Sequence, residues 1–156
     1  YGLNIYLEYK NFDLTMFWQG VQGVDVISDL KKETDLWSGL NIGFLNKGKR
    51  VLDAWTPTNP DSDIPALSRD DVNNEKRVST YFVENGSFLK LRNLQIGYNV
   101  PQNFAKKMKM ERLRLYLSAQ NLLTIKSKEF TGVDPENPNY GYPIPLNLTF
   151  GINVSF

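Results

Sequence analysis

The side chains able to perform acid–base or metal chemistry in this chain are carboxylates, hydroxyls and lysines, because the sequence contains neither cysteine nor histidine. This absence removes thiol nucleophiles, disulfide frameworks, imidazole bases and the usual zinc sites. The acidic residues remain as candidates for a calcium site or a paired-carboxylate glycosidase. Their spacing matches no calcium-binding loop and places no two of them on rigid neighbouring elements, so we predict a solvated surface with no metal, no cofactor and no enzymatic activity. The acidic residues considered are Asp61, Asp63, Asp70, Asp71, Asp134 and Glu136.

Four aromatic residues, Trp37, Trp55, Tyr140 and Tyr142, lie in segments that the sequence predicts to be loops. An aromatic ring there can stack on the apolar face of a sugar or pack against a protein partner. A long irregular segment also needs a small core of its own, so packing within the loop is the favoured interpretation for the two tryptophans. For the two tyrosines, ligand contact and loop packing both stay open.

The charge pattern gives no reason to expect a nucleic-acid partner, because 18 basic and 17 acidic residues are mixed along the 156-residue chain. A composition of 41% hydrophobic and 22% charged residues is typical of a folded protein. No stretch approaches the ~20 consecutive apolar residues of a spanning helix, and the mean hydropathy is −0.39. A transmembrane β-barrel also has a low mean hydropathy, because its apolar lipid-facing residues alternate with polar lumen-facing ones.

The strongest pattern in the sequence is a strict alternation of apolar and polar residues over the eleven positions 146–156. Period two predicts a strand, and its length exceeds the ~5–6 residues of an ordinary one. A tilted strand needs ~9–11 residues to cross a bilayer, so this segment has the length of a membrane-spanning strand. The apolar positions, which we expect to face lipid, are Leu146, Leu148, Phe150, Ile152, Val154 and Phe156.

Similar alternation predicts four further strands, and together they indicate an all-β, antiparallel fold. The polar sides of these strands would face a water-filled lumen. The five predicted strands cover residues 2–10, 12–20, 87–100, 112–124 and 146–156. The principal lumen-facing candidates on the last two strands are Arg114, Tyr116, Ser118, Gln120, Asn147, Thr149 and Asn153, and those on earlier strands are Thr15, Gln19, Gln95 and Asn99.

Three local features interrupt the alternation. Lys10 and Asn11 separate the first two alternating runs and predict a tight hairpin turn. The apolar set changes phase near Arg92 and Asn93, which predicts a β-bulge at that point, and Asn121 breaks the alternation of the following strand.

The connections between the predicted strands alternate in length. A short turn at 10–11 and a medium connection at 101–111 alternate with long segments at 21–86 and 126–145. Outer-membrane barrels have short periplasmic turns and long extracellular loops, so we expect both long segments outside the cell. The first should carry one short helix, capped by Ser28 or Asp29. The apolar face of that helix would include Leu30, Trp37, Leu40 and Phe44.

Several segments of the chain, in this order, resemble the C-terminal third of the SusC/RagA family. They are Asp53 to Pro60 (DAWTPTNP), Asn85 to Pro101 (NGSFLKLRNLQIGYNVP), Leu113 to Thr124 (LRLYLSAQNLLT) and Asp134 to Glu136 (DPE). Tyr142 and Pro143 in the last loop and the segment Phe150 to Phe156 (FGINVSF) complete the resemblance. The similarity covers essentially the whole chain.

This resemblance implies a TonB-dependent nutrient importer of the bacterial outer membrane, with a ~22-stranded barrel. The implied partners are a SusD-like surface lipoprotein, the TonB complex acting through upstream regions, outer-membrane lipid, and glycan or peptide cargo. The plug domain and the remaining strands are expected upstream of Tyr1, because five strands cannot close a barrel. Phe150, Ile152, Val154 and Phe156 resemble the terminal signal that the barrel-assembly machinery reads.

Two other classes of protein are alternatives to the importer. A soluble all-β module that binds carbohydrate through its loop aromatics should have strands of ordinary length, which the terminal alternation disfavours. An outer-membrane barrel enzyme would lack a histidine to activate its nucleophile. The identity of the cargo is left open.

Overall fold

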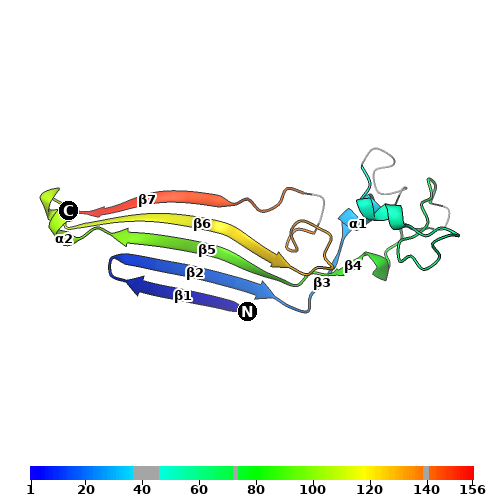
Figure 1. The fold of residues 1–156 in the computed structure, drawn as a ribbon, viewed down its shortest axis with the longest axis horizontal. Helices are drawn as coiled ribbons and strands as arrows, with labels where there is room; N and C mark the ends of the chain where they lie inside the picture. Colours follow the sequence, from blue (N-terminus) through cyan, green and yellow to red (C-terminus); the bar gives the residue numbers. More distant parts are fainter. Residues whose placement is uncertain (37–45, 72–73, 139–140) are drawn as a thin grey trace. The chain divides into compact units, whose positions relative to one another are not determined.

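The computed structural model describes residues 1–36, 46–71, 74–138 and 141–156 and divides the chain into two compact units (Figure 1). The strand unit comprises Tyr1–Gln22, Ser87–Lys126 and Ile144–Phe156. The loop unit comprises Gly23–Gly86 and Ser127–Pro143. The long connections of the sequence therefore form a folded body of their own.

The strand unit is a five-stranded antiparallel sheet with the strand order β1-β2-β5-β6-β7. This arrangement confirms the all-β class and the expected five antiparallel strands. In the described residues β1 and β7 are the two edges, so the sheet does not close on itself. The strands are β1 (Gly2–Tyr9), β2 (Phe12–Val21), β5 (Phe88–Asn99), β6 (Arg112–Lys126) and β7 (Asn147–Ser155).

The hairpin turn and the bulge lie where the sequence predicts them. Lys10 has a φ of 54°, in the left-handed region, and reverses the chain between β1 and β2. In the ladder between β2 and β5, Phe17 pairs with Asn93 and Trp18 pairs with Leu91, so Arg92 is the extra residue of the bulge. Opposite it in β6, Asn121 has a φ of 57°. The strand continues past this irregularity to Lys126, beyond the predicted end at residue 124.

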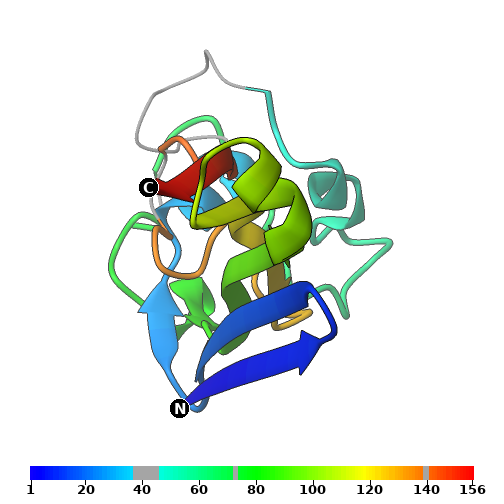
Figure 2. The ribbon, with the colours of Figure 1, turned by 90° about the vertical axis from the view of Figure 1, so that its left-hand side faces the viewer.

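The medium connection between β5 and β6 contains a short helix, α2 (Gln102–Lys107), that the sequence analysis did not anticipate. Ala105 is fully buried, and its carbonyl accepts hydrogen bonds from the backbone N–H groups of Met108 and Met110 at 3.0 Å each. Figures 1 and 2 show α2 at the same end of the strand unit as the β1–β2 turn and the C-terminus. The shorter connections thus share one end of the sheet, as the strand order requires.

The loop unit contains the predicted short helix, α1 (Asp29–Asp35). Of the two cap candidates, Ser28 is the N-cap, because its hydroxyl accepts a hydrogen bond from the backbone N–H of Lys31 at 3.2 Å. Three members of the predicted apolar face, Trp37, Leu40 and Phe44, lie outside the described residues. No helix in the described part of the chain is long and apolar enough to cross a membrane.

A small ladder closes the first long connection. Strand β3 (Asp25–Ile27) pairs antiparallel with β4 (Val83–Asn85), and two 3₁₀ helices, η1 (Lys49–Asp53) and η2 (Thr80–Phe82), lie in the chain between them. The sequence analysis predicted neither strand, because three residues are too few to display a period. This ladder brings the two ends of the 21–86 segment together.

Candidate functional site

The polar side chains of the strand unit form one continuous face. Residues directly opposite each other in neighbouring strands point to the same side of a sheet. Thr15, Gln95, Ser118 and Thr149 are paired across four strands, and the rows on either side contain the other predicted polar residues. The structure therefore brings all seven principal candidates onto one face: Arg114, Tyr116, Ser118, Gln120, Asn147, Thr149 and Asn153.

The opposite face of the same sheet is apolar and exposed. One row runs from Leu14 through Ile96 and Leu117 to Phe150. Leu117 is 52% exposed and Phe150 is 66% exposed, although both are large hydrophobic side chains. Such a wide exposed apolar surface marks a contact with lipid or with another protein. The predicted assembly residues Ile152 and Val154 share this face, and Phe156 follows the end of β7.

An ion pair lies on the polar face, near the end of the sheet that carries the β1–β2 turn. Arg114 of β6 donates to both carboxylate oxygens of Asp13 of β2, with Nε lying 3.0 Å from Oδ2. The two side chains are only 15% and 7% exposed. Asn99 donates to Asp13 Oδ2 at 3.2 Å, and Arg112 donates to the side-chain oxygen of Asn99 at 3.3 Å. The desolvated charges are thus paired and further hydrogen-bonded, as burial requires.

Two glycines make the close packing on this face possible. Asp13 and Arg114 come from strands on either side of β5, and they meet above Gly97, where an added Cβ would collide with both side chains. In the next strand pair, the ring of Tyr116 lies over Gly151 in the same way. Substitution at either glycine must displace these polar side chains from the face.

A second polar cluster surrounds the bulge. Arg92 donates through Nε to Gln19 Oε1 at 2.7 Å and through Nη1 to Asn121 Oδ1 at 3.4 Å. Ser118 donates to Asn93 Oδ1 at 3.2 Å. Because Arg92 is the extra residue of the bulge, its side chain points toward these polar partners. Strict alternation would have placed it on the apolar face.

The loop unit contains a buried ionic cluster around Asp35, which is fully inaccessible to solvent. Arg50 Nη2 lies 2.7 Å from Asp35 Oδ2, and the Tyr81 hydroxyl donates to the same carboxylate at 2.7 Å. Burial and this hydrogen bond raise the pKa of the Tyr81 phenol above its ordinary value, so it stays a donor. Lys31 donates to the Tyr81 carbonyl and lies 4.1 Å from the centre of its ring. Burial lowers the pKa of Lys31, and Arg50 lowers it further.

The two long connections contact each other through a second buried carboxylate, Glu84. The backbone N–H of Thr131 donates to Glu84 Oε2 at 3.0 Å, and the Thr131 hydroxyl lies 2.9 Å from Oε1. The hydroxyls of Thr131 and Ser28 are 3.5 Å apart, although 103 positions separate them in the sequence. The cap of α1 and the last loop are therefore parts of one hydrogen-bonded assembly.

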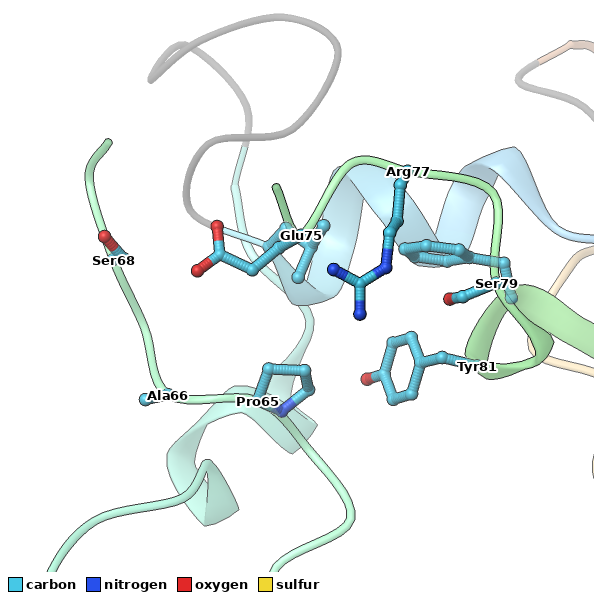
Figure 3. A pocket seen from close by; sticks show the side chains of 9 residues that line it. Pro65, Ala66, Ser68, Glu75, Arg77, Ser79 and Tyr81 are labelled. Carbon is cyan, nitrogen blue, oxygen red and sulfur yellow. The ribbon is translucent and has the colours of Figure 1, made fainter. Parts of the chain in front are cut away.

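Tyr81 also forms one wall of a cavity of about 360 Å³ within the loop unit. Figure 3 shows the guanidinium of Arg77 projecting into this space, with Glu75 to one side and the Tyr81 ring below. Phe82 is 1% exposed and packs edge-on against Tyr81, with 5.2 Å between ring centres. The lining residues are Leu36, Pro65, Ala66, Ser68, Glu75, Arg77, Ser79, Tyr81 and Phe82.

Of the predicted loop aromatics that the structure describes, neither Trp55 nor Tyr142 lines this cavity. Trp55 is 42% exposed, and its backbone N–H donates to the carbonyl of Ile64 at 2.8 Å. Tyr142 is 96% exposed. Trp37 and Tyr140 lie outside the described residues. A role for Trp55 or Tyr142 in ligand contact stays a prediction.

Asp134, one of the acidic residues considered for calcium, has a local structural role. Its Oδ1 accepts from the backbone N–H of Glu136 at 2.9 Å, and its carbonyl accepts from Asn137 at 3.0 Å, which together form a turn. Within residues 1–36, 46–71, 74–138 and 141–156, no three acidic side chains gather in an arrangement that could hold a metal ion.

The sequence alone does not reveal the residues at the centre of the polar face or of the loop unit. Asp13 alternates with Phe12 and Leu14, so its place on the polar face was readable, but its pairing with Arg114 required the register of three strands. Nothing in the sequence near Asp35 or Arg77 indicates a buried cluster or a cavity. Their partners lie far along the chain or belong to irregular segments.

Known proteins resemble this chain in both sequence and structure. No family model matches the chain. The TonB-dependent receptor P3 of Formosa agariphila is 36% identical over 171 aligned residues, which include 99% of this chain. The TonB-dependent receptor P26 of the same organism is 34% identical over 174 aligned residues, which include the whole chain. The chain spans 16% and 17% of the length of these two relatives.

Solved structures give the same result. The chain is similar to the structure of the RagAB peptide transporter, with a TM-score of 0.79 and 33% sequence identity. It is similar to the RagAB peptide importer in its "open-open" state, with a TM-score of 0.80 and 31% identity. Each alignment covers 99% of this chain and 17% of the solved chain. The chain is therefore a C-terminal β-barrel segment of a SusC/RagA-type TonB-dependent receptor, and it belongs to that family of bacterial outer-membrane proteins.

Proposed function

We propose that this chain forms part of the barrel wall and the extracellular loops of a TonB-dependent nutrient importer. The observation that carries this function is the two-faced sheet, with an exposed apolar row on one side and a paired polar network on the other. A membrane barrel needs both, because lipid contacts its outer face and water or cargo contacts its lumen. The polar residues around Asp13 and Arg114 would line that lumen, and the open edges of β1 and β7 would pair with further strands.

Glycans or peptides are the proposed cargo, and a SusD-like lipoprotein is the proposed partner at the cell surface. Support comes from the RagAB structures, which are those of a peptide transporter and importer. A soluble carbohydrate-binding module is not favoured, because the strands have membrane length and the relatives are TonB-dependent receptors. The expected absence of enzymatic activity agrees with these relatives.

Uptake by cells that carry or lack the full-length gene tests the importer directly. The probes are a tryptic peptide mixture and an oligosaccharide mixture, each followed in the medium by mass spectrometry. We expect one mixture to be depleted only by cells that carry the gene, and a protonophore should abolish this depletion. Equal depletion by cells that lack the gene, or depletion that persists in the presence of the protonophore, would contradict the proposal.

The orientation is tested by single cysteines in the full-length receptor, since this segment has no natural cysteine. Lys128, in the last loop, and Gln102, at the start of α2, are both exposed. An impermeant maleimide on intact cells should label Lys128→Cys and not Gln102→Cys. The opposite labelling would reverse the assignment of outside and inside.

A further inference from the structure

We propose that helix α2 is a membrane anchor that binds anionic phospholipid at the periplasmic surface of the outer membrane. Its apolar residues Phe104 and Met108 would enter the leaflet, and the lysines of the same connection would contact phosphate groups. The inference goes beyond import, because it concerns the lipid around the barrel and not the cargo inside it. It rests on the proposed orientation, in which the α2 end of the sheet is periplasmic.

A row of aromatic side chains marks where the apolar face of the sheet ends. Tyr9, Phe12 and Tyr98 are paired across three neighbouring strands, at the end that carries the β1–β2 turn. The ring centres of Phe12 and Tyr98 are 4.8 Å apart, and Tyr9 is 72% exposed. Girdles of aromatic residues flank the apolar band of membrane barrels at both interfaces. This row therefore marks the level of the lipid headgroups at this end of the sheet.

Helix α2 begins beside this aromatic row. The backbone N–H of Asn99, at the end of β5, donates to the carbonyl of Asn11 in the β1–β2 turn at 2.7 Å. The side-chain amide of Asn11 donates in return to the Asn99 carbonyl at 2.9 Å. Val100 and Pro101 then lead directly into α2, which Figures 1 and 2 show at this end of the strand unit. The helix thus lies at the level where headgroups meet the barrel.

One side of α2 lies toward the polar face of the sheet. Of the six described residues of the helix, only Ala105 is buried, so it marks the side that packs against the strand unit. Gln102 and Lys106 line a shallow hollow together with Arg112 and Ser155. Arg112 and Ser155 are paired between β6 and β7 and belong to the polar face, because alternate residues of a strand share a face. The hollow therefore identifies the lumen side of the helix.

Phe104 and Met108 lie on the opposite side. Successive residues of a helix are ~100° apart, so Phe104 and Lys106 project to opposite sides of Ala105. Met108 follows Phe104 by one turn and shares its side. Their exposed fractions are 61% and 48%, although both are large and apolar. They point away from the polar face, and a lipid leaflet supplies the apolar environment that water does not.

A basic residue accompanies this apolar pair. Lys107 Nζ lies 5.7 Å from the centre of the Phe104 ring. Apolar and basic side chains placed side by side are typical of an interfacial helix, whose apolar residues enter the leaflet while its charged groups stay among the headgroups. The long aliphatic stem of a lysine lets its ammonium group reach that layer.

The charge of the whole connection between β5 and β6 is positive. Its basic residues are Lys106, Lys107, Lys109 and Arg112, and its single acidic residue is Glu111. The three lysines are exposed, and none forms an ion pair with a carboxylate in the described part of the chain. A headgroup with a net negative charge is the complementary partner, and a zwitterionic headgroup is a weaker one.

Competition between two lipids tests the charge selectivity. The purified full-length receptor in detergent is mixed with equal amounts of dioleoylphosphatidylglycerol, which is anionic, and dioleoylphosphatidylcholine, which is zwitterionic and has the same acyl chains. Native mass spectrometry counts the lipids that stay bound. We expect the anionic lipid to be retained at least about threefold over the zwitterionic one. Equal retention of the two lipids would overturn the inference.

Two triple variants then assign the selectivity to α2. The test variant combines Lys106→Gln, Lys107→Gln and Lys109→Gln and should lower the retention ratio by at least about half. The control removes the same charge from three exposed positions of the loop unit, through Lys49→Gln, Arg69→Gln and Lys128→Gln, and should keep the ratio. Heat-modifiable migration verifies that both variants are folded. An unchanged ratio in the test variant, or an equal fall in the control, would overturn the assignment.

Nitroxide labels on single cysteines test whether the apolar pair enters the leaflet. The full-length receptor is labelled at Phe104→Cys, Met108→Cys or Gln102→Cys and reconstituted into vesicles of the two lipids. Oxygen concentrates in hydrocarbon, whereas a nickel chelate stays in water. We expect the ratio of oxygen to nickel collisions to be higher at positions 104 and 108 than at 102. A ratio at 104 no higher than at 102 would show a solvated turn and overturn the inference. A label at 104 that neither reagent reaches would show that a protein segment covers the helix, and it would equally overturn the inference.

The outcome is separable from those of the importer and orientation proposals. Lipid retention is measured on purified receptor, uptake on cells, and orientation by maleimide labelling. Energy-dependent uptake without lipid selectivity would leave the importer standing and refute the anchor. Lipid selectivity that depends on the three lysines, in a receptor whose gene has no effect on uptake, would support the anchor and refute import. Labelling of Gln102→Cys on intact cells would refute the orientation and the periplasmic placement of the anchor, whatever lipid is retained.

Discussion

The strand unit and the loop unit both contain buried charges, but they place those charges by different means. In the strand unit Asp13 and Arg114 meet because the register of β2, β5 and β6 aligns them over Gly97. In the loop unit Asp35, Arg50 and Tyr81 come from α1, η1 and η2, which share no ladder. The sheet has a continuous backbone scaffold, whereas the loop unit depends on the side-chain cluster itself.

This difference indicates which substitutions should destabilise each unit. Backbone hydrogen bonds repeat along every strand of the sheet, so one lost side-chain contact leaves the ladder intact. The described part of the loop unit has one three-residue ladder and short helices, so its buried carboxylates must supply much of its specific structure. A substitution in the buried cluster should therefore open the loop unit and leave the sheet unchanged.

The largest expected effect is that of Asp35→Ala. The change leaves the positive charge of Arg50 and the hydroxyl of Tyr81 without their buried acceptor, which typically costs ~3–5 kcal/mol. Hydrogen exchange of the full-length receptor should show faster exchange in residues 46–54 and 79–85 and no change in β5 and β6. Asp29→Ala is the control, because Asp29 is 41% exposed and lies 3.7 Å from Lys32. Equal effects of the two substitutions would contradict the difference between the units.

The next largest effect concerns the two faces of the sheet. Ile152→Arg places a charge on the apolar face and should lower the free energy of unfolding in a bilayer by ~2–4 kcal/mol, the cost of an arginine near the midplane. Asn153→Arg, one position along the same strand, should cost much less, because it lies on the polar face and the charge of its cross-strand neighbour Arg114 is already paired with Asp13. Urea titration of the full-length receptor folded in lipid vesicles measures both. Similar destabilisation by the two variants would remove the assignment of lipid and lumen faces.

A smaller effect is expected from the ion pair of the polar face. A double-mutant cycle of Asp13→Asn and Arg114→Gln should give a coupling energy of ~0.5–3 kcal/mol, because the groups are in direct contact and mostly buried. Urea titration in lipid vesicles measures the stability of the two single variants and of the double variant. A coupling energy near zero would show that the contact between the two side chains adds no stability of its own, and that register rather than the pair determines this part of the fold.

The smallest effect is that of Ser28→Ala at the start of α1. Loss of the cap hydrogen bond to Lys31 should lower the local free energy of opening by ~1 kcal/mol. Hydrogen exchange at residues 29–35 measures it, with Ser28→Asn as the control that retains an uncharged acceptor at this buried position. Faster exchange in both variants would indicate that contact with Thr131, rather than capping, is the main contribution of Ser28.

The sequence by itself determined the five long strands and the alternation of their faces, the turn at Lys10 and Asn11, a bulge near Arg92 and Asn93, and a helix that begins at Ser28 or Asp29. The physical reason is that each of these features depends on neighbours a few positions away. Alternation at period two reports burial along a strand, a phase change reports an extra residue, and a hydroxyl before an apolar run caps a helix. Even the shared polar face of Arg114 and Asn153 follows once the strands are placed.

Only the tertiary structure decided the ion pair above Gly97, the cluster around Asp35 and the cavity beside Arg77. Each of these depends on register or on contacts between segments that are distant in sequence, such as the 46 positions between Asp35 and Tyr81. A carboxylate in an irregular loop has the same local pattern whether it is solvated or buried, so no period or motif distinguishes the two. Burial and the geometry of the partners distinguish them, and both arise only when the chain has folded.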